Sequence, residues 1–170
     1  MDVPAGIAGA ISAAGVDGLA DNHGIEQGDL VDVHWTDPAD GTHKCRRGIT
    51  VDVAAANAIE FDNDPAAEGD ALPAEDTAVV VSQRVTINAS FDGDDMVILG
   101  LKADQRLMVD FRTAAESLDA RKLIANEGYS WATGLADNPL TGEAVATIVA
   151  SNGSTVATVL YLGLLYDSVA

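Results

Sequence analysis

The chain has 170 residues and carries 27 acidic against 9 basic side chains, which gives a formal net charge of -18 at pH 7. A hydrophobic content of 48% favours a folded core over the alternative of a disordered acidic segment, because such segments have little apolar surface to bury. Cys45 is the only cysteine, which excludes an intrachain disulfide and a Cys-x-x-Cys metal or redox motif.

The acidic excess consists mainly of aspartate. Asp occurs 20 times and Glu 7 times, whereas Lys occurs only at Lys44, Lys102 and Lys122. Short, strongly hydrated carboxylates in place of long alkyl-ammonium side chains are typical of proteins that function in brine. Near molar salt the Debye length falls to roughly 3 Å, so repulsion between the carboxylates is screened. The composition therefore predicts a protein of a halophilic host.

Residues 1–24 form an Ala- and Gly-rich segment that contains Ile7 and Ile11. Asp2 stands where a signal peptide would have a basic residue, and the apolar run is too short to span a bilayer. We expect this segment to be an N-terminal arm that packs on a neighbouring subunit or on a membrane surface, with a frayed tail as the alternative. Residues 25–170 are expected to form the folded domain.

Alternation of apolar and polar residues predicts eight strands in this domain. They are expected near residues 29–35, 43–53, 58–61, 78–89, 96–101, 107–111, 143–151 and 154–167. An acidic loop is expected over residues 62–76, and Asn152-Gly153 predicts a hairpin turn between the last two strands. A capping-box pattern from Thr113 to Glu116 predicts one helix over residues 113–126.

These elements predict an all-β fold. Eight antiparallel strands with one short helical stretch suit a sandwich of two four-stranded sheets in the jelly-roll arrangement better than an immunoglobulin-type sandwich.

The sequence lacks the motifs that mark common enzymes. It has no Gly-x-Ser-x-Gly, no Walker motif and no dinucleotide fingerprint, and Cys45 has no obvious base beside it. His34 and His43 can face each other across a hairpin, which gives two metal ligands at best, fewer than a cupin-type site requires. We therefore predict a protein that is not an enzyme and has no cofactor or metal site. A cupin-like enzyme and a carbohydrate-binding surface module remain the alternatives of other classes.

Lys44, Arg46 and Arg47 bring three of the nine basic side chains together. A positive patch on an anionic chain is expected to contact the acidic loop of a neighbouring subunit, where opposite charge fixes the register. Protection of an exposed strand edge is the alternative. We expect no direct binding of nucleic acid, because the net charge repels phosphate.

The segment from Val159 to Tyr166 is apolar on both faces of its predicted strand. One face of a sandwich strand is normally hydrated, so the second face requires a cover: the predicted helix, another subunit or lipid. The candidate assembly residues are therefore the three bases above together with Leu160, Tyr161, Leu162, Leu164, Tyr166, Ile7 and Ile11.

The brine composition, the strand layout and the doubly apolar strand together resemble the single-jelly-roll major capsid proteins of icosahedral, membrane-containing haloarchaeal viruses. The resemblance covers residues 25–168 and implies an upright jelly roll in the virion capsid, which contacts copies of itself, other capsid proteins and an internal viral membrane. It transfers no site residue to this chain. Gly28-Asp-Leu-Val31 also resembles a strand of the small β-domains in decoration or turret proteins of tailed haloarchaeal viruses, which is the alternative within this class.

The net charge predicts that the fold depends on salt. Below roughly 0.2 M salt the Debye length exceeds about 7 Å, so we expect the protein to loosen or dissociate on dialysis to lower concentrations. Thermal denaturation across a series of salt concentrations measures this dependence. A melting temperature that stays constant up to about 3 M salt would show that the inference of a halophilic protein is wrong.

Overall fold

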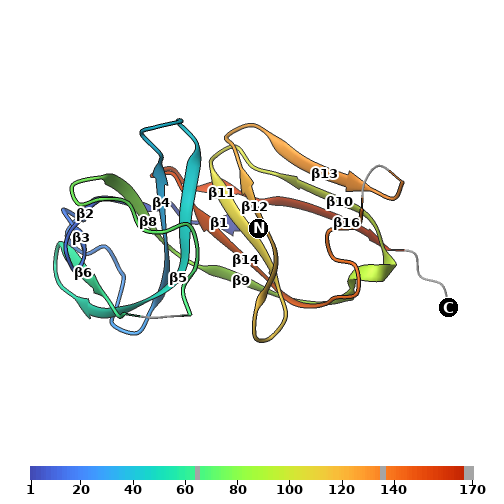
Figure 1. The fold of residues 1–170 in the computed structure, drawn as a ribbon, viewed down its shortest axis with the longest axis horizontal. Helices are drawn as coiled ribbons and strands as arrows, with labels where there is room; N and C mark the ends of the chain where they lie inside the picture. Colours follow the sequence, from blue (N-terminus) through green and yellow to red (C-terminus); the bar gives the residue numbers. More distant parts are fainter. Residues whose placement is uncertain (64–65, 135–136, 167–170) are drawn as a thin grey trace. The chain divides into compact units, whose positions relative to one another are not determined.

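The computed structural model describes residues 1–63, 66–134 and 137–166, apart from the side chain of Tyr166. The described residues form sixteen strands and one short 3-10 turn (Figure 1). The predicted all-β, antiparallel fold class is confirmed. The strands belong to two compact units.

The first unit comprises Pro4–Arg84 and Ser151–Ala157, and we call it the barrel unit. Six of its strands form an antiparallel ring, because the first and the last of them, β4 and β5, also pair with each other. In order around the ring they are β4 (Leu30–Thr36), β8 (Ala78–Gln83), β2 (Ile7–Ile11), β3 (Gly15–Asp17), β6 (Ala58–Phe61) and β5 (His43–Ala54). A seventh strand, β7 (Glu68–Gly69), pairs with β5.

The barrel core consists of apolar side chains from these strands and from the connecting segments. It includes Val16, Val31, Val33, Ile49, Val51, Ile59 and Val81, all of them buried. Strand β4 is buried on both faces, since Asp32 and His34 are as inaccessible as the valines between them. The side chains on the outward face of β4 are therefore also shielded from solvent by other parts of the chain.

The second unit, which we call the sandwich unit, comprises Met1–Val3, Val85–Ala150 and Thr158–Ala170. One sheet contains, in spatial order, β12 (Ser117–Leu123), β11 (Leu107–Arg112), β14 (Ala144–Asn152) and β9 (Val85–Asp92). A second contains β13 (Gly128–Ala132), β10 (Met96–Lys102) and β16 (Tyr161–Tyr166). The pair β1 (Asp2–Val3) and β15 (Thr158–Val159) and the 3-10 turn η1 (Gly93–Asp95) complete the unit.

The two larger sheets of the sandwich unit share one apolar core. Leu99, Leu101 and Trp131 of the three-stranded sheet belong to the same buried cluster as Phe111 and Ile148 of the four-stranded sheet. The strand pairs within this unit whose register is known are antiparallel.

The helix expected over residues 113–126 is wrong. The Thr113 hydroxyl does accept the amides of Ala115 and Glu116, as a helix cap would, but it closes a turn that leads into β12. Strand β12 then pairs with β11 from Leu107 to Arg112. Pairing along a whole strand overrides the helix propensity of a short Ala- and Leu-containing segment.

The hairpin expected at Asn152-Gly153 is also wrong, because β14 pairs within the four-stranded sheet while β16 pairs with β10. Asn152 is buried, and its side-chain amide donates to the carbonyl oxygens of Pro4 and Val156. Its side-chain oxygen accepts the amide of Ser154. The asparagine thus organises a longer connection in place of a two-residue turn.

The N-terminal residues, for which an arm was expected, lie in strands of both units: β1 is in the sandwich unit, and β2 and β3 are in the barrel ring. The strand predicted over residues 78–89 consists of two strands, β8 and β9, which belong to different units and meet at Arg84. No helix among the described residues is long and apolar enough to cross a membrane.

Replacing Gly15 by alanine tests the close approach of β3 and β6. A Cβ at this position would overlap the carbonyl oxygen of Ile59 in the paired strand. We therefore expect the free energy of unfolding to fall by about 1–3 kcal/mol. Chemical denaturation followed by circular dichroism measures the change.

Gly163→Ala is the matched control, because a Cβ at Gly163 would have no heavy atom within 4 Å. Its stability is expected to stay within about 0.5–1 kcal/mol of the wild type or to rise, since alanine loses less backbone entropy than glycine on folding. Equal stability of Gly15→Ala and the wild type would contradict the packing described here.

Candidate functional site

The outer face of the three-stranded sheet in the sandwich unit is apolar and exposed. Strand register places Ala132, Ile98 and Leu165 in one row across β13, β10 and β16. Ile98, Leu165 and Tyr161 expose 42%, 53% and 59% of their surface. Contiguous exposed apolar surface is uncommon on monomeric proteins and marks contact sites.

A shallow groove crosses this outer face. Its middle row consists of Ser130, Gly100 and Gly163, and the next row contains Lys102 and Tyr161. The groove has a volume of about 600 Å³. Because the middle row has almost no side-chain bulk, a partner can approach the backbone of the sheet there.

The predicted assembly residues of β16 divide between the two faces of the sheet. Leu160, just before the strand, is buried, and Leu162 and Leu164 pack partly buried against the core. Tyr161 lies on the outer face, and the side chain of Tyr166 lies outside the described residues. Residues 113–126 were expected to cover this strand as a helix. They do not form a helix, and residues 117–123 are strand β12 of the four-stranded sheet.

The basic cluster has acidic partners within its own unit. Lys44 lies 3.9 Å from the carboxylate of Asp37, and Arg47 lies 3.5 Å from that of Glu68. Arg46 is opposite Gly69 in the β5–β7 pair. The acidic loop of residues 62–76 was expected to contact the basic cluster of a neighbouring subunit. Within this chain, its strand β7 pairs with β5, which carries the basic cluster.

Ile7 and Ile11, the two arm residues among the assembly candidates, belong to the barrel. Ile11 is buried in the barrel core, and Ile7 packs against that core partly buried. Their side chains therefore already have apolar contacts within the chain.

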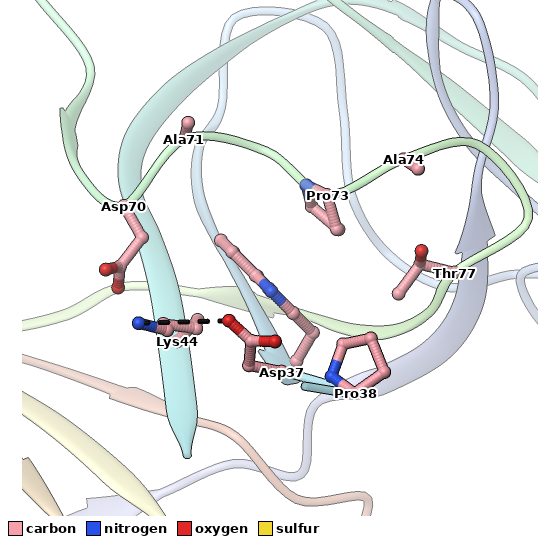
Figure 2. Close-up of a pocket in the computed structure, with 9 residues that line it drawn as sticks. Asp37, Pro38, Lys44, Asp70, Ala71, Pro73, Ala74 and Thr77 are labelled. Carbon is pink, nitrogen blue, oxygen red and sulfur yellow. Dashed lines mark ion pairs between the residues drawn. The ribbon is translucent and has the colours of Figure 1, made fainter. Parts of the chain in front are cut away.

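A second hollow lies beside the basic cluster and has a volume of about 370 Å³. Figure 2 shows the segment from Asp70 to Thr77 along one side, with Asp37, Pro38 and Lys44 on the other. The ion pair between Lys44 and Asp37 lies at this hollow, so the one basic side chain among its lining residues already has an acidic partner.

Polar side chains gather on the outward face of β4 and β5, where Ser151, near the end of β14, meets them. The Ser151 hydroxyl donates to Asp32 Oδ2 over 2.5 Å and lies 3.1 Å from His34 Nε2. His34 Nδ1 lies 3.1 Å from His43 Nε2, and the two rings stack with centroids 5.3 Å apart. Cys45 Sγ lies 3.9 Å from His34 Nε2. We call these five residues the polar cluster.

A register shift in the β4–β5 pair brings Cys45 into this cluster. Val31 is opposite Ile49, whereas Val33 is opposite Arg46, so β5 contains one extra residue between them. Without this bulge, Cys45 would share a face with Ile49, since strand side chains alternate. With it, Cys45 lies opposite His34 on the outward face.

The bulge also supplies a partner for the buried carboxylate. Gly48 adopts a φ of 66°, and its amide donates to Asp32 Oδ1 over 2.8 Å. Arg84 Nε lies 3.4 Å from the same oxygen. Burial raises the pKa of Asp32 above its usual range, and this effect outweighs Arg84, Ser151, Gly48 and Arg47, which act in the opposite direction.

Four of the five residues of the polar cluster are buried and His43 is half-buried, and the cluster does not resemble a hydrolase site. Asp32 and His34 are each 1% exposed, and Ser151 and Cys45 are fully buried. Ser151 donates its proton to a carboxylate, whereas a nucleophilic serine would donate to a histidine base.

The sequence predicted two potential metal ligands at best, and the structure places the potential donor atoms of Asp32 and Cys45 close to that of His34. The facing of His34 and His43 is confirmed by their hydrogen-bonding distance. Gly48 is the feature of the sequence that could have predicted the place of Cys45 in the cluster, because an isolated glycine within a strand indicates a bulge.

Comparison with protein-family models, with curated proteins and with solved structures finds no significant match to this chain.

Removing the charge partner of Asp32 is expected to destabilise the barrel unit. Arg84→Met leaves a buried carboxylate without its cation, so we expect a loss of about 3–5 kcal/mol in the free energy of unfolding. The double variant Asp32→Asn/Arg84→Met should recover a large part of this loss. Chemical denaturation of the wild type, both single variants and the double variant measures the coupling.

Lys44→Met is the control, because its ion pair with Asp37 is partly exposed and is expected to contribute about 0–1 kcal/mol. An Arg84→Met effect of the same size in the presence and absence of the Asp32 carboxylate would contradict this account.

Proposed function

We propose that this protein is a structural subunit of the virion shell of a halophilic archaeal virus, and that it assembles through the outer face of its three-stranded sheet. The observation that supports the proposal best is the exposure of Ile98, Tyr161 and Leu165 on a face with a nearly flat centre. Burial of apolar surface is the main driving force for most protein association.

The charge distribution supports contact at this face in particular. Two chains with a net charge of -18 repel each other over most of their surfaces. None of the nine positions in the three rows of the outer face is acidic, and its only charged side chain is the cation Lys102. A second copy can therefore approach there without bringing carboxylates together, provided that salt screens the rest of the surface.

Among shell components, the architecture favours a decoration or turret protein over a major capsid protein. The resemblance to major capsid proteins depended on a single eight-stranded jelly roll, whereas the strands divide between a six-stranded ring and a sandwich. Gly28-Asp-Leu-Val31, the segment whose resemblance supported the decoration alternative, leads into β4 of the six-stranded ring.

A carbohydrate-binding module is the second candidate, and Tyr161 favours it. This tyrosine is 59% exposed beside the groove of the outer face, where its ring can stack on a sugar. Thermal stabilisation by sugars, with a chain that stays monomeric in molar salt, would favour this function over assembly.

Placing a carboxylate on the outer face tests assembly. Tyr161→Asp and Leu165→Asp should each weaken self-association in molar KCl about 30-fold, because each removes apolar contact area and adds like charge. Sedimentation velocity over a concentration series measures the association, and circular dichroism checks that the variants are folded.

Ile124→Asp is the matched control, since Ile124 is 54% exposed in the same unit but lies outside the three rows of the outer face. Its association should equal that of the wild type. A wild-type chain that remains monomeric at every concentration in molar salt would refute the proposed assembly.

A further inference from the structure

We propose that Asp32, His34 and Cys45 form a structural binding site for one zinc-type divalent metal ion in the barrel unit. The inference goes beyond the proposed shell function and does not depend on it. It is supported by the positions of the donor atoms, by the residues that orient them and by their burial.

The three donor atoms are close enough to share one ion. Asp32, His34 and Cys45 each offer a ligand atom within 4.8 Å of the other two, and Cys45 Sγ lies 3.9 Å from His34 Nε2. Metal–ligand bonds of about 2.0–2.3 Å in tetrahedral zinc sites require ligand atoms about 3.3–3.8 Å apart. The donor atoms must therefore move together by about 1 Å to reach the distances of a tetrahedral zinc site, and rotation of the side chains can supply this movement.

Two of the ligands are oriented from the side away from the proposed ion. His43 lies 3.1 Å from His34 Nδ1, which leaves Nε2 facing Cys45 and Ser151. Gly48 and Arg84 contact Asp32 Oδ1, which leaves Oδ2 facing Ser151. Hydrogen bonds to the second atom of a ligating histidine or carboxylate are characteristic of protein metal sites.

The Ser151 hydroxyl is placed to complete the coordination. It lies 2.5 Å from Asp32 Oδ2 and 3.1 Å from His34 Nε2, and a shift of about 1 Å away from Oδ2 would give the spacing that two ligands of one ion require. As a neutral oxygen it would add a fourth donor without adding charge. The carboxylate of Asp32 and the thiolate of Cys45 then balance the two positive charges of the ion, and the Cys45 thiol proton is released to solvent on binding.

The donor set selects the class of metal and the kind of site. One thiolate, one imidazole and one carboxylate suit zinc, whereas calcium and magnesium require mostly oxygen donors. Asp32, His34, Cys45 and Ser151 are at most 1% exposed. A closed site of this kind has no open position for a substrate, so its role is structural.

The ion would join parts of the barrel unit that are distant in the sequence. Asp32 and His34 belong to β4, Cys45 belongs to β5, and Ser151 begins the segment that covers them. One ion would therefore hold the covering segment onto the ring.

Titration of chelator-treated protein with Co²⁺ in molar KCl tests the site. We expect uptake of one ion per chain, with visible d–d bands and a near-ultraviolet thiolate-to-cobalt charge-transfer band. Zn²⁺ should displace Co²⁺ and, at about a hundredfold excess over its Kd, raise the melting temperature by about 5–10 °C. Folded wild-type protein without the thiolate band, or without a Zn²⁺-dependent rise, would overturn the proposal.

Variants assign the ligands. Cys45→Ser and His34→Gln should each abolish the Zn²⁺-dependent rise in melting temperature, whereas His23→Gln should retain it. His23 is the matched control, because its ring contacts the carbonyl oxygen of Ala55 outside the polar cluster. If one ligand variant does not fold, the other still decides the question. A rise that persists in a folded ligand variant would show that the metal binds elsewhere.

Discussion

The carboxylate of Asp32 is the group on which the outward side of the barrel depends. One of its oxygens accepts the amide of the bulge at Gly48 and pairs with Arg84, while the other accepts the hydroxyl of Ser151. It therefore links β4 to β5, to the end of β8 and to the segment that covers them. Such a group is costly to bury, and each of these contacts offsets part of that cost. The position of His34 follows, because it shares Ser151 with the carboxylate.

The sequence was most informative where strands alternate regularly. Strand β6 was predicted with its observed bounds, and β4, β10 and β11 within one residue at each end. In such segments the side chains of one face enter the core, so the pattern and the burial agree. The apolar character of both faces of β16 was also visible, and it led to the exposed side chains of the outer face.

The failures have a common physical cause: local preference was overridden by pairing between distant segments. Residues 117–123 contain good helix formers, yet they extend along β11. Asn152-Gly153 favours a tight turn, yet the Asn152 side chain is buried and bonded to Pro4 and Val156. The polar cluster was missed for a similar reason, because regular alternation in β5 places Cys45 on the wrong face unless the bulge at Gly48 is recognised.

The path of the chain between the two units has a consequence for its synthesis. The barrel unit contains Pro4–Arg84, but its last segment, Ser151–Ala157, follows sixty-six residues of the sandwich unit, Val85–Ala150. While the chain emerges from the ribosome, Asp32 and His34 therefore lack Ser151 until the whole of Val85–Ala150 has been made. Neither unit corresponds to one continuous stretch of the gene, so neither can be gained, lost or exchanged as a simple cassette.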